Sequence, residues 1–157
     1  MISAVFDGMV FLQAVGSRTG PAAACLSLVE QKHVKLLVSA EILEEVRDIL
    51  YRPGVRKGFP TLTDEIVDEF IDHVVDLAHA IEQVPVAYRL DRDPDDECYL
   101  NLAIAAQAPL LVSRDKDLLD LMKDDAFRKA YPTLAIVDPP SFLAHVRAEI
   151  AKSTGSN

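Results

Sequence analysis

The sequence has no tryptophan, only two cysteines and only six glycines among 157 residues. Cys25 and Cys98 lie far apart without cysteine or histidine companions at ligand spacing, which excludes a disulfide framework, a zinc cluster and a redox motif. A hydrophobic share of 50% excludes collagen-like and disordered chains. What remains is an ordinary globular composition, long enough for one domain with a buried core.

A long hydrophobic run is also missing. The longest, Leu102 to Val112, contains Gln107 and Pro109 and is about half the ~20 residues that a membrane-spanning helix needs. No basic stretch precedes the apolar opening of the chain, and Asp7 interrupts it, so a secretory signal is not expected. We therefore expect a cytoplasmic protein without a membrane segment.

Basic side chains are scarce: 16 stand against 25 acidic ones, for a net charge of -9. This balance disfavours nucleic-acid binding driven by lysine and arginine alone. An enzyme that holds divalent cations between its own carboxylates and a phosphate can nevertheless be acidic, because the metal supplies the local positive charge. The positions of the acids therefore matter more than their number.

Short apolar runs bounded by polar residues predict buried parallel strands, with a weaker edge candidate at Val84 to Ala87. The stronger candidates are Ile2 to Phe6, Val34 to Val38, Leu110 to Val112 and Leu134 to Val137. Helical patterns are expected over residues 21–31, 39–50, 63–81, 94–106 and 141–151. This alternation predicts one α/β domain over residues 1–152, with a mostly parallel sheet of four to five strands between helices, and a disordered tail over 153–157.

Two acids follow predicted strands directly. Asp7 comes after the first strand and Asp115 after the strand that ends at Val112. In parallel sheets the carboxyl ends of the strands form the ligand-binding edge, so both side chains are candidates for a site there. A turn before Gly8 and a helix cap at Asp115 are the alternative interpretations.

Glu45 lies at the edge of the apolar stripe of the second predicted helix, whereas its acidic neighbours fall further round toward solvent. It is therefore the acid of that helix best placed to reach inward, with a solvated rim position as the alternative.

The run from Asp91 to Glu97 is rich in aspartate. Asp93 fits a helix N-cap with Pro94 at the first helical position, while Asp96 shares the inward face with Leu100. A carboxylate on a buried face needs a partner or a metal. An EF-hand loop is excluded because its glycine and its spaced final glutamate are missing.

The predicted fold therefore directs Asp7, Glu45, Asp96 and Asp115 toward one edge of the sheet. A cluster of carboxylates without matching cations either raises its pKa values or binds a hard cation, and oxygen ligands suit Mg²⁺ or Mn²⁺. Metal ions held in this way can activate water against a phosphodiester.

The sequence resembles the PIN-domain proteins, and it is closest to the branch of toxins from toxin–antitoxin pairs. The likeness covers roughly residues 2 to 137. It is carried by Val5-Phe6-Asp7 with Val10, by Ser39 to Glu45 running on to Ile49 through Pro53, by Asp93 to Asp96 with Leu100 and Ala103, and by Ser113 to Leu119.

This resemblance implies a Mg²⁺- or Mn²⁺-dependent endoribonuclease that acts on RNA, forms a homodimer and is silenced by a protein antitoxin. Asp7, Asp96 and Asp115 would be metal ligands, and Glu45 would be a ligand or would orient the attacking water. Asp117 would assist, and Ser113 stands where the family commonly has threonine.

The sequence departs from the family at two positions. Gly8 stands where threonine or serine is common, and Met9 stands where a small polar residue is usual; methionine offers no useful hydrogen bond to a carboxylate or to water. This departure leaves open an alternative function, a degenerate domain that binds protein or RNA without cutting. A phosphatase of another α/β fold is disfavoured, because Met9 stands where the second aspartate of the Asp-x-Asp pattern would be needed.

Candidate contacts to the RNA backbone are Arg52, Arg114 and Lys116. Arg56 and Lys57 are better explained as solubilising or helix-end charges. The four histidines share no ligand-like spacing and are interpreted as surface or packing residues.

Overall fold

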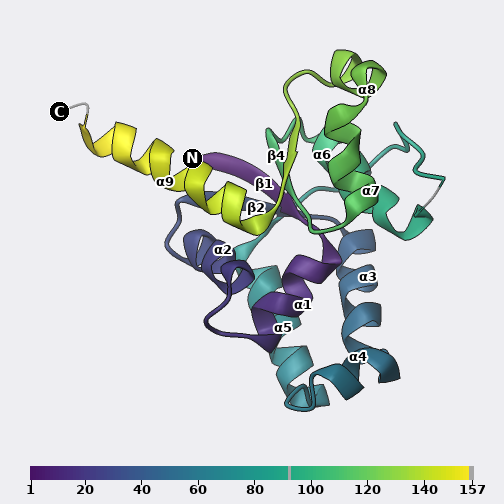
Figure 1. Ribbon diagram of the computed structural model, residues 1–157. Helices are drawn as coiled ribbons and strands as arrows, with labels where there is room; N and C mark the ends of the chain where they lie inside the picture. Colours follow the sequence, from purple (N-terminus) through teal and green to yellow (C-terminus); the bar gives the residue numbers. More distant parts are fainter. Residues whose placement is uncertain (92, 156–157) are drawn as a thin grey trace.

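The computed structural model describes residues 1–91 and 93–155 and has a five-stranded parallel sheet at its centre (Figure 1). The strands lie in the order β3-β2-β1-β4-β5. Their bounds are β1 (Ile2–Phe6), β2 (Val34–Val38), β3 (His79–Ala80), β4 (Leu110–Val112) and β5 (Ala135–Val137). The chain moves outward from β1 to β3 and then returns to place β4 on the other side of β1. Strand order therefore reverses between β1 and β4, where open α/β sheets bind ligands.

Helices join the strands. Their bounds are α1 (Gly8–Gly16), α2 (Pro21–Glu30), α3 (Ala40–Tyr51), α4 (Pro53–Gly58), α5 (Asp64–Leu77), α6 (Glu97–Ala105), α7 (Lys116–Leu119), α8 (Asp125–Ala130) and α9 (Pro139–Gly155), with short 3₁₀ turns η1 (Pro94–Asp96) and η2 (Asp120–Lys123). Side-chain oxygens cap several of them, as the sequence predicts: Ser39 accepts from Ile42 N at 3.2 Å at the start of α3.

The core lies between the sheet and the helices. Its largest fully buried side chains include Phe6 on β1, Phe11 on α1 and Phe142 on α9, whose rings contact one another through Phe6. Helix α6 packs against β1 and β4, and α2 packs against β2 and α9. Cys25 and Cys98 are buried and unbridged, as expected.

The predicted helix over residues 63–81 is wrong at its end. Helix α5 stops at Leu77, and His79 and Ala80 form the edge strand β3, paired with Leu37 and Val38. The backbone N–H of Ile81 then donates to Val38 O at 2.8 Å. The weaker strand candidate at Val84 to Ala87 is wrong as well, because this segment has no regular secondary structure, and the N–H of Ala87 donates to the Asn101 side chain of α6 at 2.9 Å.

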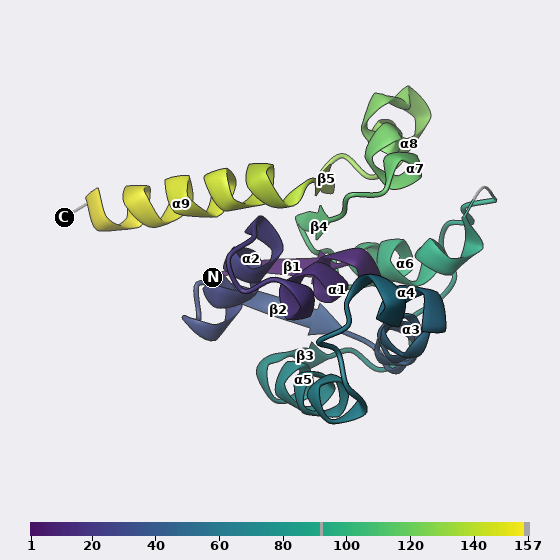
Figure 2. The same ribbon diagram turned by 60° about the horizontal axis from the view of Figure 1, so that its bottom comes forward.

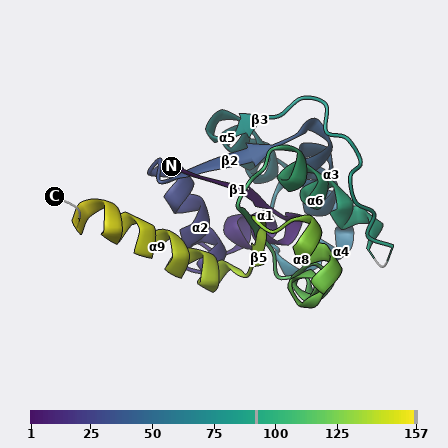
Figure 3. The ribbon, with the colours of Figure 1, turned by 90° about the horizontal axis from the view of Figure 1, so that it is seen from above.

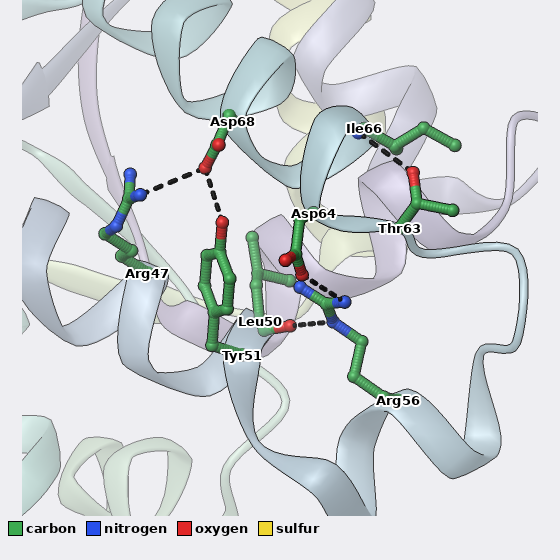
Figure 4. Close-up of polar contacts among 8 residues, drawn as sticks. All are labelled: Arg47, Leu50, Tyr51, Arg56, Thr63, Asp64, Ile66 and Asp68. Carbon is green, nitrogen blue, oxygen red and sulfur yellow. Dashed lines mark hydrogen bonds and ion pairs between the residues drawn. The ribbon is translucent and has the colours of Figure 1, made fainter.

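Arg56 anchors the corner between α3, α4 and α5 (Figure 4). Its Nε donates to Leu50 O at 2.7 Å, its Nη1 lies 2.9 Å from Asp64 Oδ1, and its guanidinium lies over the Tyr51 ring at 4.7 Å. Asp68 accepts from the Tyr51 hydroxyl and from Arg47. Arg56 lies in the last turn of α4, as the helix-end interpretation predicts, and its contacts make it a structural residue as well.

Helix α9 carries the C-terminal part of the chain away from the body of the molecule (Figure 2). It buries Phe142, Leu143 and Val146 and continues to Gly155, past the predicted end at residue 151. Residues 153–155 of the predicted disordered tail are thus helical, and residues 156–157 lie outside the described residues. Within the described part of the chain, no helix combines the length and apolarity needed to cross a membrane.

Candidate metal centre

The carboxyl ends of β1 and β4 hold the centre of the site. Asp7 follows β1 directly, and Ser113 and Asp115 follow β4. The two strands are paired, with Phe6 opposite Val112, and the backbone N–H of Asp7 donates to Val112 O at 3.0 Å. The sheet therefore fixes the relative positions of residues that are far apart in the sequence.

Asp7 is almost fully buried, with 1% of its surface exposed. Its Oδ1 accepts from Val10 N at 3.0 Å and so caps α1, and its Oδ2 accepts from the Ser113 hydroxyl. Burial raises the pKa of Asp7 to about 6, although both hydrogen bonds oppose the shift. The cap interpretation of Asp7 is thus confirmed, while its role as a metal ligand stays a prediction, because the group of carboxylates described below is formed by Asp93, Asp96 and Asp115.

Asp115 likewise follows a strand, β4, and caps the helix that comes after it. Its Oδ1 accepts from Asp117 N at 2.8 Å and from Leu118 N at 3.3 Å, which caps α7. Its own N–H donates to Ser113 Oγ at 2.9 Å. Ser113, which is fully buried, therefore connects Asp7 with Asp115.

A group of three carboxylates lies at this edge of the sheet. Asp93, Asp96 and Asp115 each offer an oxygen, and these oxygens all lie within 4.8 Å of one another. Asp93 stands at the N-cap position of η1, but its side chain makes no cap hydrogen bond. The predicted capping role of Asp93 is therefore wrong, because its carboxylate faces Asp96 and Asp115 instead.

Asp96 is the most strongly perturbed acid of the group. Burial and the hydrogen bond with Asp93, followed by the charges of Asp93, Asp115 and Asp7, raise the pKa of Asp96 to about 8. The pKa of Asp93 is also raised, chiefly by burial. These shifts are the expected response of crowded acids without a neighbouring cation.

Glu45 approaches the same region from α3. It is partly buried, while Glu41, Glu44 and Asp48 are exposed, so the predicted inward phase of Glu45 is confirmed. Its carboxylate lies outside the group of three and within 3.5 Å of Arg52. Burial, followed by the charge of Asp95, raises the pKa of Glu45. A hollow lined by residues of α3 and η1 joins it to the aspartate-rich turn: Glu41, Glu44, Glu45, Asp48, Pro94, Asp95 and Cys98.

The cationic residues predicted to contact RNA differ in whether their charge is already paired. Arg52 pairs with Asp48 at 3.0 Å, so its charge is partly used within α3. Arg114 and Lys116 flank Asp115 and are exposed. Asp117 is half-buried at the start of α7, and its N–H binds Asp115. All four histidines are exposed, in agreement with their predicted surface placement.

The donor set fits a hard divalent cation. The grouped oxygens come only from carboxylates, which Mg²⁺ and Mn²⁺ prefer to nitrogen or sulfur ligands. Burial is the largest cause of the raised pKa values of Asp7 and Asp96, and neighbouring carboxylates add to it; a bound cation would favour the charged forms of both acids.

Two further residues border the site. Met9 is 44% exposed, so its side chain does not replace the missing polar group at its position. Tyr99 is buried beside Gly8, and its hydroxyl has no hydrogen-bond partner among the described residues. Sequence reasoning placed neither Asp93 nor Tyr99 in the site; the spacing of three between Asp96 and Tyr99 was the available signal for the latter.

These features define a class of protein, an α/β domain whose parallel sheet gathers carboxylates at the ends of its central strands. The chain belongs to the PIN domain family, which it matches over residues 3–117. Among solved structures it is similar to VapBC2 from Rickettsia felis bound to a DNA fragment from their promoter, with a TM-score of 0.53, 16% sequence identity, and coverage of 87% of this chain and 98% of that chain. No curated protein sequence matches it. The predicted family and fold are thus confirmed.

Proposed function

We propose that this protein is a Mg²⁺- or Mn²⁺-dependent endoribonuclease that hydrolyses RNA phosphodiesters. The observation that carries the proposal is the convergence of Asp93, Asp96 and Asp115 within 4.8 Å beside the buried Asp7. Membership of the PIN domain family supports the same reaction class. When bound, a divalent cation would acidify a water molecule and offset the negative charge of the phosphate under attack.

The residues of the chain take separate roles in this proposal. Asp93, Asp96 and Asp115, whose grouped oxygens lie within 4.8 Å of one another, would hold the cation, with the buried Asp7 as a further ligand. Glu45 lies beside them with a raised pKa, and it orients the attacking water and accepts its proton. Ser113 fixes Asp7. Asp117 supports Asp115. The proposed contacts to the RNA backbone are Arg52, Arg114 and Lys116.

We further propose that the protein is a toxin paired with a protein antitoxin, and that it acts as a homodimer in the cytoplasm. The support is the sequence likeness to the toxin branch of the family and the similarity to VapBC2, which was solved as a complex on DNA from its own promoter. The family match covers residues 3–117, which include all the proposed site residues. The antitoxin and the homodimer are proposed independently of the metal chemistry.

A second function, RNA or protein binding without cleavage, is favoured by Gly8 and Met9. Neither residue supplies a polar side chain next to Asp7, and Met9 is exposed. In this case the acidic centre would persist as a structural or regulatory cation site. Cleavage activity distinguishes the two functions, because both allow metal binding.

The first test is Mn²⁺ titration by calorimetry, since it needs no knowledge of the RNA target. Asp96→Asn should lower Mn²⁺ affinity by at least about tenfold, because changes to groups that merely orient ligands already cost about 10–100-fold. Asp95→Asn is the matched control: Asp95 is adjacent but exposed, and its loss should have little effect. Equal binding by native protein and Asp96→Asn would reject the site.

RNA cleavage is then measured with the same three proteins and Mn²⁺. The proposal expects cleavage by native protein and Asp95→Asn, abolished in Asp96→Asn and by a chelator. Metal binding without cleavage of any RNA, in pooled cellular RNA as substrate, would favour the binding function.

A further inference from the structure

Tyr99 is the largest fully buried side chain of the protein, with 1% of its surface exposed. It lies on α6 one helical turn after Asp96, so the two side chains project from the same face of the helix. Its ring fills the space between α6, the start of α1 and α3. A phenylalanine would fill the same volume, and only the hydroxyl group distinguishes tyrosine here.

The position of that hydroxyl depends on Gly8. A β-carbon on Gly8 would lie 2.7 Å from the Tyr99 hydroxyl oxygen and would also collide with Ile49 Cδ1. Real β-carbons do not come that close, so a side chain at position 8 would force Tyr99 and Ile49 to shift from the positions they occupy here. The absence of a side chain on the residue after Asp7 therefore admits a tyrosine hydroxyl beside the site.

This hydroxyl has no hydrogen-bond partner among the described residues. A buried unpaired hydroxyl is costly and rare in native proteins, and where one occurs a ligand or a functional role is the usual explanation. The other buried polar side chains of the site are satisfied: Asp7 accepts two hydrogen bonds and Ser113 makes two. Tyr99 is thus the exception in an otherwise complete network.

The surroundings of the hydroxyl make it a donor. Burial raises its pKa, and the charges of Asp7, Glu45 and Asp96 are close enough to raise it further, so the group keeps its proton. Among the described residues, the hydroxyl has no hydrogen-bond acceptor. An acceptor that arrives with the cation would complete its bonding.

We propose that the Tyr99 hydroxyl is a positioning group of the metal centre, which donates a hydrogen bond to a water molecule of the bound cation's hydration shell. This inference rests on the proposed metal site. It adds a residue from α6 that acts through the cation's water and does not itself bind the metal. It also gives Gly8 a function, because glycine leaves room for the hydroxyl without a shift of Tyr99 or Ile49.

The test compares Tyr99→Phe with Tyr51→Phe. Tyr51 is the matched control because its hydroxyl has a partner, Asp68 Oδ1 at 2.6 Å, within the α3–α5 corner. Each variant is titrated with Mn²⁺ alone by calorimetry, and its thermal midpoint is measured with and without Mn²⁺. Removal of one hydroxyl keeps the ring volume, so both variants should fold.

The two variants should show opposite signatures. Tyr99→Phe should weaken Mn²⁺ binding about 2–10-fold, the equivalent of one hydrogen bond, and should leave the metal-free thermal midpoint unchanged or higher. Tyr51→Phe should lower the metal-free midpoint and leave Mn²⁺ affinity unchanged. The Mn²⁺ affinity decides the proposal.

Equal Mn²⁺ affinity of Tyr99→Phe and native protein would overturn the role of Tyr99 and leave the metal site intact. A lowered metal-free midpoint together with that equal affinity would show that the hydroxyl is bonded within the fold. Native protein that binds no Mn²⁺ would instead overturn the metal site on which the inference rests, so the two failures are distinguishable.

Discussion

Asp7 and Asp115 each cap a helix and also belong to the proposed metal site. One oxygen of each carboxylate accepts backbone N–H groups at the start of a helix, Val10 for Asp7 and Asp117 with Leu118 for Asp115. The cap fixes the side chain's rotamer, so its remaining oxygen is directed without help from a flexible loop. Removing either acid would therefore damage both a helix start and the proposed site, which makes Asp96 the cleaner position for testing chemistry.

Substitution at Ser113 should show how much the metal centre depends on an orienting group. Ser113→Ala leaves Asp7 without its Oδ2 partner, which raises the Asp7 pKa further and should weaken Mn²⁺ binding about 10–100-fold. Ser113→Thr keeps the hydroxyl and should retain most of the affinity. Calorimetric titration with Mn²⁺ checks both.

Ser39→Ala is the control for the effect of losing a buried hydroxyl as such. Ser39 is also buried, and its hydroxyl accepts from Ile42 N at the start of α3. Its loss should lower the thermal midpoint and leave Mn²⁺ affinity unchanged. Native-like Mn²⁺ binding by Ser113→Ala would mean that Asp7 does not take part in the site.

Residues at strand ends are predictable from the sequence, and residues in turns are less so. Asp7 and Asp115 follow apolar runs that can only be buried strands, and the helical phase of Glu45 sets its direction. Asp93 was misassigned because an aspartate before a proline satisfies the pattern of a helix cap, and the sequence does not reveal that its carboxylate turns away. Tyr99 reads as an ordinary core residue, because a missing hydrogen-bond partner leaves no mark in a sequence.

At the scale of elements, α6 does more than cover the sheet. Asn101, buried on this helix, accepts N–H donors from Ala87 and Tyr88 and donates to Tyr88 O at 3.1 Å. Glu97 accepts from Leu90 N at 2.9 Å. These side chains hold the segment without regular structure that leads to Asp93. The helix thereby positions a site residue that lies before its own start.

Asn101→Ala should loosen this segment. The substitution leaves three backbone polar groups without partners, and it should cost roughly 1–3 kcal/mol of stability, measured by chemical denaturation. Mn²⁺ affinity should fall as well, because Asp93 loses its fixed approach. Glu97→Ala removes a single contact and should have a smaller effect on both quantities; a larger effect than that of Asn101→Ala would contradict this account.

Elements with a continuous buried apolar run were predicted better than elements without one. Strands β1, β2 and β4 match the predicted apolar runs residue for residue, because a buried parallel strand needs a continuous run. Strand β3 was missed because two exposed residues, His79 and Ala80, carry no pattern, and their pairing with β2 depends on where α5 ends. The amphipathic pattern of α5 does not indicate that the helix ends at Leu77.

At the scale of the whole molecule, the concentration of acids in one place makes stability depend on pH. Asp7 has a pKa of about 6 and Asp96 of about 8 in the folded protein, against an ordinary value of 3.8. Between these limits the folded protein binds more protons than the unfolded chain. The stability of the metal-free protein should therefore fall as pH rises from about 4 to about 8.

Denaturant titrations across this range measure the effect, with Asp96→Asn as comparison. The variant lacks the titrating group, so the difference between native and variant stability should shift in favour of the variant as pH rises. Saturating Mn²⁺ should stabilise the native protein most at the upper end of the range, where the carboxylates are ionised. A pH-independent difference would show that Asp96 is not buried among acids.

The order of strands in the sheet has a consequence for the protein's synthesis. Ser113 and Asp7 are 106 positions apart in sequence, yet they lie on the two adjacent central strands. A nascent chain emerges from its N-terminus, and it exposes Asp7 long before Asp96, Ser113 and Asp115 are made. The carboxylate centre cannot assemble until β4 has left the ribosome and inserted beside β1. A translation product that ends before β4 would thus lack the assembled carboxylate centre, and the proposed metal binding would begin only after residues 110–115 have been made.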